Sequence, residues 1–308
     1  QDAPVRALRR LRDVLSGLGI SEILNYSLVA EPLLDLVDPD QRAQRIVIPR
    51  PISADQSVLR TSLVPQMVDT LGRNRAHQVA EAALFEIGRT FRRDGEQDRL
   101  VIGLMGPIGR SGVDRRRAME ASELFLWAKG IVEALASAMK VEACAVRPAA
   151  VACAEAGGAA EVLLDSEVAG TLALVHKRIR KEWRLNDPVA IIDLAVAPLL
   201  ARALAHRGFQ DIPAYPSVAR DVAMVVGDEI RHEDIVRVIR QAAPRELETV
   251  ELFDIFKGGA LPPGRRSVAY SLVYRSSART LTDEEANGYH EHVKRALRSE
   301  LGAEIRES

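Results

Sequence analysis

The chain has 308 residues, of which 47% are hydrophobic and 28% are charged, and its formal net charge is −1 at pH 7. This composition is typical of an ordinary soluble globular protein, and the length suffices for two domains with separate cores. The balanced charge excludes a globally basic nucleic-acid-binding protein, so any RNA contact must come from a local patch.

Cysteine usage and hydropathy indicate the compartment. The two cysteines, Cys144 and Cys153, lie in an alanine-rich region without CxxC spacing or a nearby histidine cluster. We therefore expect neither a disulfide framework nor a metal site, and a cytoplasmic location fits best. No apolar run reaches about 18 residues, which excludes a membrane-spanning helix. No signal peptide precedes the first predicted helix, and the absence of an initiator methionine indicates a piece of a longer protein.

Apolar spacing predicts a first domain over residues 1–205 that mixes helices and strands. A helix is expected over 4–18, where leucines recur at three-to-four spacing with arginines between them. A strand is expected over 20–29, and a helix over 63–75 with Ser62 as its N-cap. Further strands are expected over 84–91, 100–105, 159–164, 168–175 and 189–196, with helices over 122–139 and after Pro198.

The run from Leu84 to Asp94 is typical of a buried strand that ends in a charged loop. Apolar residues surround a single glutamate, and Gly88 indicates a close backbone approach. Arg89, Arg92 and Arg93 follow, and arginine suits a two-pronged grip on a phosphate or carboxylate. A strand edge with solvated charges explains the same pattern, so both interpretations remain open on spacing alone.

Residues 206–216 are predicted to form a linker, because glycine and two prolines interrupt the apolar pattern there. The domain over 217–308 is expected to follow the order β-α-β-β-α-β, which is that of the ferredoxin-like fold. Thr282 and Glu285 are expected to form a capping box at the start of the last helix. The strands are predicted over 218–226, 247–256, 266–275 and 303–306, and the first helix over 233–243.

Several blocks of the sequence resemble one family. The run through Arg92 resembles the second signature motif of class II aminoacyl-tRNA synthetases, although Asp94 stands where that motif has a glutamate. Residues 50–65 are similar to a segment of the phenylalanyl-tRNA synthetase β-subunit family, with Arg50 in place of an asparagine. The strongest blocks resemble the ferredoxin-fold anticodon-binding domain that ends that subunit, and they cover 215–226, 252–258, 267–270 and 274–285.

The resemblance implies an α+β chain: a class II synthetase-like antiparallel sheet with helices, followed by the ferredoxin-like domain. In that family the first module lacks an active site and packs against the catalytic α subunit. It implies no catalytic residue here, a degenerate second motif at Arg92 and Asp94, and no cofactor in this part, with ATP and magnesium serving the whole enzyme. The strand over 189–198, where a third motif is expected, has neither glycine nor arginine. A site without the second arginine that would bind the phosphates of ATP is not expected to activate an amino acid.

The second domain is expected to bind tRNA(Phe) on its open sheet face, where unpaired bases stack and cations hold phosphates. Alternation places Val268, Tyr270, Leu272 and Tyr274 under the helices, and Ala269, Ser271, Val273 and Arg275 on the open face. The candidate tRNA-binding residues form a basic rim of Lys257, Arg265, Arg266, Arg275 and Arg279. For each of them a solvated loop charge explains the sequence equally well. His290 and His292 are expected to be exposed to solvent rather than to bind metal.

Two other functions are open on the sequence. One is a self-sufficient adenylate-forming class II paralogue that uses Arg92 and Asp94, and the missing third motif counts against it. The other is a module that senses a small ligand, since the ferredoxin-like fold has many functions. The expected partners are the α subunit and tRNA(Phe), without a membrane. Apolar surface left uncovered without α could make the isolated chain form homodimers.

Overall fold

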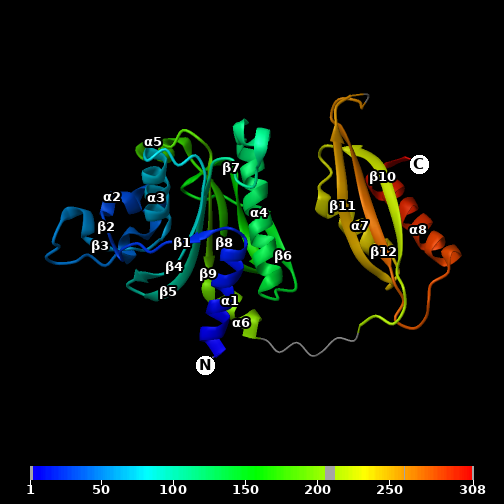
Figure 1. Cartoon of the computed structure of the whole chain (residues 1–308), viewed down its shortest axis with the longest axis horizontal. Helices are drawn as coiled ribbons and strands as arrows, with labels where there is room; N and C mark the ends of the chain where they lie inside the picture. Colours follow the sequence, from blue (N-terminus) through cyan, green and yellow to red (C-terminus); the bar gives the residue numbers. More distant parts are fainter. Residues whose placement is uncertain (1–2, 205–211, 260, 307–308) are drawn as a thin grey trace. The chain divides into compact units, whose positions relative to one another are not determined.

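A computed structural model describes residues 3–204, 212–259 and 261–306. The chain divides into two compact units, Gln1–Arg207 and Gly208–Ser308 (Figure 1). Much of the expected linker over 206–216 lies outside the described residues. Each unit has its own sheet and its own apolar core.

The first unit is built on a seven-stranded sheet with the order β1-β4-β5-β9-β8-β7-β6. Neighbouring strands pair antiparallel except β1 and β4, which are parallel. The strands are β1 (Ser21–Glu22), β4 (Ala82–Arg92), β5 (Gly95–Met105), β6 (Cys144–Pro148), β7 (Ala154–Leu164), β8 (Glu167–Val175) and β9 (Val189–Ala195). A separate small sheet joins β2 (Leu28–Val29) to β3 (Val58–Leu59).

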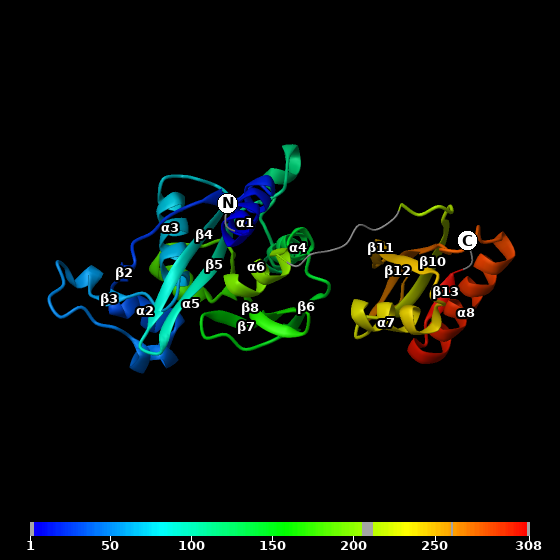
Figure 2. The same cartoon turned by 90° about the horizontal axis from the view of Figure 1, so that it is seen from below.

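Helices cover both faces of this sheet (Figures 1 and 2). One face carries α1 (Ala3–Gly17), α4 (Ala121–Ala138) and α6 (Val196–Leu204), and the other carries α2 (Glu31–Val37), α3 (Val64–Ala76) and α5 (Lys177–Glu182). Successive side chains of β5 alternate between the two faces of the sheet. Since helices cover both faces, the residues of β5 that lie beneath them are apolar on both sides. Leu100 and Ile102 join the core under α4, whereas Val101 joins the core under α3. Short 3-10 segments lie at Pro39–Gln44, Ala54–Gln56 and Gly112–Arg116.

The structure differs from the predicted elements of this unit at several places, and helices α2 and α5 were not predicted. The prediction of one strand over 20–29 is wrong, because the segment divides into β1 and β2, which belong to different sheets. Between them, the Asn25 side chain donates a hydrogen bond to the Glu86 carboxylate. Leu63, not Ser62, occupies the N-cap position of α3, although the Ser62 hydroxyl accepts a hydrogen bond from the Val64 amide at 3.2 Å. Strand β6 was not predicted, since it lies at the sheet edge and has no buried side chain.

The second unit has a four-stranded antiparallel sheet with the order β11-β12-β10-β13. Its elements are β10 (Val218–Gly227), α7 (His232–Ala242), β11 (Leu247–Lys257), β12 (Arg265–Tyr274), α8 (Asp283–Leu301) and β13 (Glu304–Arg306). Figure 2 shows both helices on one face of the sheet, which is the predicted ferredoxin-like arrangement. The capping box is confirmed, because Thr282 accepts from the Glu285 amide and Glu285 accepts from the Thr282 amide. Under the helices lie Val268, Tyr270, Leu272 and Tyr274, as predicted.

The prediction that His290 is exposed is wrong. Its residue exposure is 5%, because it lies on the buried side of α8, the helix that packs on β10. Burial is the main cause that lowers the pKa of His290, and the nearby Lys294 ammonium lowers this pKa further. His292 is exposed, as expected.

The stability of the second unit is expected to fall as the pH drops below about 6.5, the ordinary pKa of an unfolded histidine. The folded-state pKa of His290 is lower, so in this window the unfolded state binds more protons. The free energy of unfolding then declines by at most about 1.4 kcal/mol per pH unit. Denaturant unfolding followed between about pH 5 and 7 should show this slope, and His290→Gln should flatten it. The matched control His292→Gln should keep the slope, and a His290→Gln slope equal to the control's would refute the assignment.

Candidate functional site

A polar cavity of about 240 Å³ lies on the face of the large sheet that α3 covers. Strands β4, β5, β8 and β9 form its floor, and the segment after α2 and the segment before α3 close it. The polar side chains that line it are Asp38, Thr61, Ser62, Thr90, Arg92, Gln97, Arg99, Thr171 and Asp193.

The cavity brings together two carboxylates and two guanidinium groups. Arg99 donates to the Asp193 carboxylate through Nε at 2.9 Å, and Asp38 accepts from the Thr61 hydroxyl at 2.9 Å. Asp193 keeps 20% of its side-chain area exposed, and Asp193 is one of the residues that line the cavity. Burial therefore raises the pKa of Asp38 and of Asp193, and the Arg92 charge opposes both shifts. The charged groups of the cavity thus neutralise one another.

The three arginines of the charged segment point to different places. Arg89 pairs with Glu96 at 2.8 Å and with Asp98 at 3.0 Å, whereas Arg93 donates to the Arg45 carbonyl. Only Arg92 reaches the cavity. Asp94 lies in the two-residue turn between β4 and β5, where it is exposed and does not line the cavity. The expected charged loop is therefore a tight turn, and Arg92 and Asp94 do not form one site.

These residues do not fit the polyphosphate of a nucleoside triphosphate. A phosphate clamp needs unpaired cations, but Arg99 is held by Asp193, and Arg92 faces the carboxylates of Asp38 and Asp193. Phosphate oxygens in the cavity would meet two carboxylates at close range, which is unfavourable in a partly desolvated site. The two-residue turn after Arg92 is also too short to fold over a bound nucleotide.

A buried polar network fixes strand β4 beneath the cavity. Glu86 is 0% exposed and accepts from Arg60 Nη1 at 2.7 Å and from Asn25 Nδ2 at 2.9 Å. Arg60 also donates to the Arg89 carbonyl at 2.9 Å. Gly88 permits this arrangement, because a β-carbon at that position would collide with the Arg60 guanidinium. The close approach expected at Gly88 is thereby confirmed.

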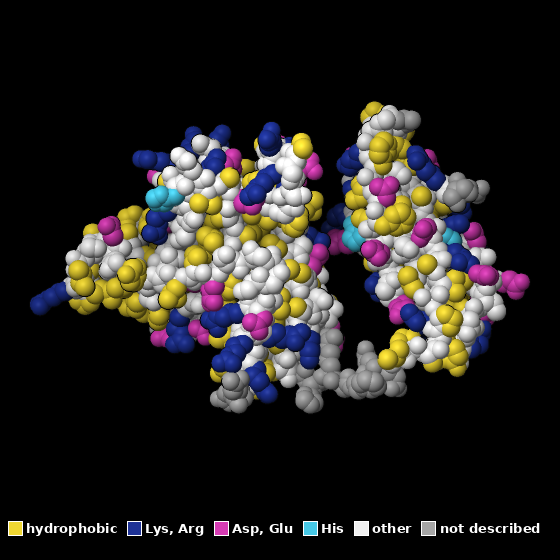
Figure 3. Space-filling model, in the orientation of Figure 1, with side chains coloured by type: hydrophobic (Ala, Val, Ile, Leu, Met, Phe, Trp, Pro, Cys, Tyr) yellow, Lys and Arg dark blue, Asp and Glu magenta, His cyan; other side chains and the backbone are white. Residues whose placement is uncertain are grey.

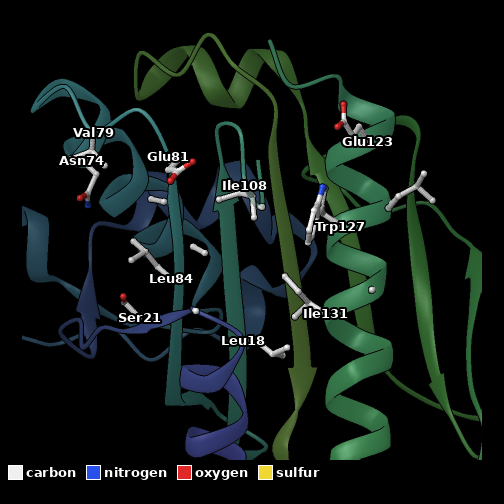
Figure 4. A pocket seen from close by; sticks show the side chains of 16 residues that line it. Leu18, Ser21, Asn74, Val79, Glu81, Leu84, Ile108, Glu123, Trp127 and Ile131 are labelled. Carbon is white, nitrogen blue, oxygen red and sulfur yellow. The ribbon is translucent and has the colours of Figure 1, made fainter. Parts of the chain in front are cut away.

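A larger, mainly apolar groove of about 1020 Å³ lies beside the β4 edge of the sheet (Figure 4). Figure 4 shows Trp127 and Ile131 reaching into it from α4, with Leu84 on the opposite wall and Glu123 at one end. Leu126, which also lines the groove, is 65% exposed. The groove is open to solvent and lined by side chains that favour burial, which is typical of a protein contact surface.

In the second unit, strand register divides the predicted basic rim between two faces. Arg265 pairs with Gly227 on the open face, whereas Lys257 and Arg266 pair with each other on the helix-covered face. Arg275 directly follows the end of β12, where continued alternation would put it on the open face. The Arg266 guanidinium donates to the Ile230 carbonyl, which holds it against the segment before α7. The five residues therefore do not form one continuous patch.

Each of the other four candidates has an acidic partner. Lys257 pairs with Asp228 at 2.9 Å, and Arg265 pairs with Glu304. Arg275 pairs with Glu248 at 2.8 Å. Arg279 pairs with Glu285, and this contact is the largest of the causes that lower the pKa of Glu285 to about 2. RNA phosphates would have to compete with these carboxylates, which the sequence pattern alone does not reveal.

Two exposed aromatic residues of the open face were not predicted. Phe253 is 55% exposed and Phe256 is 51% exposed. Phe256 pairs with Ser267 of the open face, and Phe253 is the extra residue of a bulge between Leu252 and Asp254. The bulge breaks the alternation along β11, so counting every second residue from Leu252 assigns Phe256 to the helix-covered face, which is the wrong one. In the sequence, only the presence of apolar residues on β11, an edge strand, indicates that these two rings are exposed.

The described residues show neither a helix suited to span a membrane nor a cluster suited to hold a metal ion. Across 3–204, 212–259 and 261–306 no helix is long and apolar enough to cross a membrane. The same residues contain no group of three or more histidine, cysteine, aspartate or glutamate side chains that could hold a metal ion.

Part of the fold is similar to solved structures. A pyrrolysyl-tRNA synthetase from Desulfitobacterium hafniense superposes with a TM-score of 0.53 over 65% of this chain and 69% of that structure. A second structure of the Desulfitobacterium hafniense protein gives a TM-score of 0.52 over 64% of this chain and 67% of that chain. The sequence identity is 13% in both cases, so the likeness concerns the fold alone.

Curated relatives share the sequence over nearly the whole chain. The phenylalanine–tRNA ligase beta subunit of Symbiobacterium thermophilum is 34% identical over 96% of this chain, and that of Syntrophotalea carbinolica is 34% identical over 98%. The protein of the same name from Clostridium tetani is 32% identical over 96% of this chain. The chain spans only 34%, 38% and 37% of the lengths of these three relatives.

Two family models match consecutive parts of the sequence. The model described as ferredoxin-fold anticodon binding domain matches residues 213–306 and so covers the whole of the β-α-β-β-α-β sheet. The model described as phenylalanyl tRNA synthetase beta chain CLM domain matches residues 2–196, which include the seven-stranded sheet and its cavity. Through this match over most of its length, the chain belongs to the phenylalanyl tRNA synthetase beta chain family.

Proposed function

We propose that this chain is a non-catalytic part of the β chain of a phenylalanine–tRNA ligase. It supports the catalytic α subunit through its first unit and binds tRNA(Phe) through its second unit. The first unit is a class II catalytic-like module without an active site. The observation that carries this proposal is the cavity in which Arg92 faces Asp38 and Asp193 rather than an open phosphate site.

The same cavity argues against a self-sufficient adenylate-forming enzyme. Strand β9 lies where a third synthetase motif would supply an arginine, and it places Asp193 there instead. A carboxylate at this point would repel the phosphate charge that such an arginine neutralises. Asp94, the second residue on which the alternative depends, is turned away from the cavity. ATP and magnesium are therefore proposed to act in the α subunit, and the assembled enzyme is proposed to work in the cytoplasm.

The groove beside β4 is the proposed contact surface for the α subunit. The apolar side chains of Leu18, Leu126 and Trp127 are 42%, 65% and 40% exposed, and a partner would remove them from water. Gly109 helps to shape the groove, since the Trp127 ring lies against it and leaves no room for a β-carbon. Without α, the same uncovered surface is proposed to drive self-association of the isolated chain.

The open face of β11, β12 and β10 is the proposed tRNA(Phe) surface. Small side chains such as Ala269 and Ser271 form its floor, and Phe253 and Phe256 stand at its edge strand. Unpaired bases stack on such aromatic rings, while Arg265 and Arg275 supply charge on the same face. Lys257, Arg266 and Arg279 are assigned a peripheral part in this contact.

Co-elution with an α subunit on gel filtration tests the proposed assembly. The chain is expected to shift to the elution volume of a complex when α is added, and Leu126→Asp is expected to abolish the shift. Val168→Asp is the matched control, because Val168 is 54% exposed on β8 and does not line the groove. A chain that never co-elutes with α would refute the assembly, whereas equal loss in both variants would refute only the groove as its site.

A further inference from the structure

The short helix α5 and the residue pair that follows it carry a cluster of exposed cations. Four side chains project into solvent within eight residues of sequence. Figure 3 shows Lys and Arg side chains gathered over this part of the first unit, at the top left of the view. We define the α5 cation patch as Lys177, Arg178, Lys181 and Arg184.

The cations of this patch differ from most others in the chain, because they lack protein partners. None of the four side chains makes a hydrogen bond or an ion pair with any residue that the structure describes. By contrast, Arg265, Arg275 and Arg279 of the second unit each pair with a carboxylate. The net charge of the whole chain is −1, whereas residues 177–184 hold five cations and one carboxylate, the exposed Glu182, so the patch is a local concentration of positive charge.

Buried groups hold the patch in place from beneath. Arg180 is 7% exposed and donates to the carbonyls of Val175, Asn186 and Asp187 at 3.0, 2.9 and 2.7 Å, respectively. It also pairs with Glu155 at 2.9 Å. These bonds tie the start of α5 to the segment after it. A guanidinium with this many fixed partners acts as an internal anchor rather than a ligand contact.

Two further contacts fix the orientation of the helix. The His176 ring accepts a hydrogen bond from the Arg178 amide at 3.0 Å and so caps the first turn. At the other end Trp183 packs so closely on Gly72 of α3 that a β-carbon there would clash. The Arg75–Asp187 ion pair at 3.1 Å joins the same two segments. The patch is therefore a rigid platform on the C-terminal part of α3.

Such a cluster is unfavourable for folding by itself. Lys177 and Lys181 are four residues apart on one helix and repel each other, and an isolated helix of six residues is not stable in water. The anchors beneath the patch offset this cost. Unpaired cations that are held close together by buried contacts have the properties of a surface for a polyanion.

We propose that the α5 cation patch binds the phosphodiester backbone of RNA, and specifically that of the tRNA assigned to the second unit above. This inference rests on the proposed function for its ligand. The patch consists of two lysines and two arginines and includes no aromatic ring on which a base could stack. Such side chains bind phosphates rather than base edges, so the contact carries no sequence preference. It adds affinity and orientation to the base contacts of the second unit.

An anionic membrane is the competing polyanion, and the surroundings of the patch disfavour it. Peripheral membrane binding needs exposed apolar side chains that enter the lipid next to the cations. No large apolar side chain is exposed between Val168 and Leu204. The segment that carries the patch is thus suited to a soluble polyanion.

Salt-dependent binding of a tRNA(Phe) transcript tests the patch. The test variant replaces all four residues by glutamine, and the parent chain is measured beside it from 50 to 300 mM salt. The slope of log affinity against log salt should become shallower by about 3, since each lost phosphate contact removes about 0.7–0.9 from it. Affinity at about 100 mM salt should fall at least roughly tenfold.

The matched control makes the same change in net charge elsewhere. It replaces by glutamine four exposed arginines that pair with carboxylates, namely Arg42, Arg89, Arg147 and Arg231. The control should keep the parent's slope within about one unit. Equal losses in both variants would overturn the proposal, because net charge and not the patch would then set the affinity.

Two further outcomes separate the inference from the proposed function. A parent that binds tRNA with a slope that the patch variant leaves unchanged would overturn the patch alone. A parent that does not bind tRNA at low salt would overturn the proposed function together with the patch. Vesicles that contain phosphatidylserine are the second probe. Loss of vesicle binding with unchanged tRNA binding in the patch variant would identify a lipid surface and contradict the proposal.

Discussion

Replacing Arg60 by alanine is expected to lower the free energy of unfolding of the first unit by about 3–5 kcal/mol, the usual cost of breaking a buried ion pair on one side. Glu86 has no exposed surface, and Arg60 supplies its shortest hydrogen bond, at 2.7 Å. Without the guanidinium, the carboxylate keeps only the Asn25 contacts and has to be protonated or solvated inside the protein. Loss of the bond to the Arg89 carbonyl adds to the effect.

Urea unfolding of the chain, followed by a signal from the first unit, measures this cost. Glu86→Gln combined with Arg60→Met is expected to recover much of the loss, because no charge is then buried without a partner. Arg42→Ala is the control: Arg42 pairs with Asp35 but is 67% exposed, and its loss is expected to cost under about 1 kcal/mol. An Arg60→Ala cost as small as the control's would show that the network does not stabilise β4.

The double variant Phe253→Ala, Phe256→Ala is expected to weaken tRNA(Phe) binding roughly 30-fold or more, since each base stacked on an aromatic ring contributes about 1–3 kcal/mol. Both rings are more than half exposed, so they contribute little to the apolar core. The free energy of unfolding should therefore change little while the affinity for tRNA falls. Direct binding and denaturant unfolding of the same preparations give the two quantities.

Ile255→Ala is the matched control for this pair. Ile255 is 54% exposed on the same strand, but it pairs with Val268 and so lies on the opposite face. Its replacement removes similar apolar area without touching the proposed RNA surface. If Ile255→Ala weakens binding as much as the double variant, the open face is not the RNA surface. Unchanged binding in the double variant would lead to the same conclusion.

The fold of the second unit could be predicted from the sequence because each of its signals is local. Alternation along β12 identifies the buried face, and the Thr282–Glu285 capping box marks the start of α8. His290 was assigned incorrectly, because a single polar residue on the inner side of a helix does not disturb the apolar repeat. The two short strands around Asn25 were also missed, since the residue that separates them is held by a distant glutamate.

The candidate site of the first unit depends on contacts that no local pattern contains. Asp38, Arg92 and Asp193 come from separate segments, and only the neighbouring positions of β4, β5 and β9 bring them to one cavity. The sequence indicated that Arg92 ends a strand, but not that carboxylates would face it. Likewise the partners of Lys257 and Arg265 follow from the sheet register rather than from spacing.

Phenylalanine-dependent exchange between ATP and pyrophosphate tests the central claim most directly. It is measured for the chain alone, for the chain with an α subunit, and for both again with Arg92→Ala. The account predicts no exchange by the chain alone, and exchange by the complex that persists in Arg92→Ala, because the Arg92 cavity takes no part in the chemistry. Exchange by the chain alone that disappears in Arg92→Ala would contradict it and make the cavity a working active site.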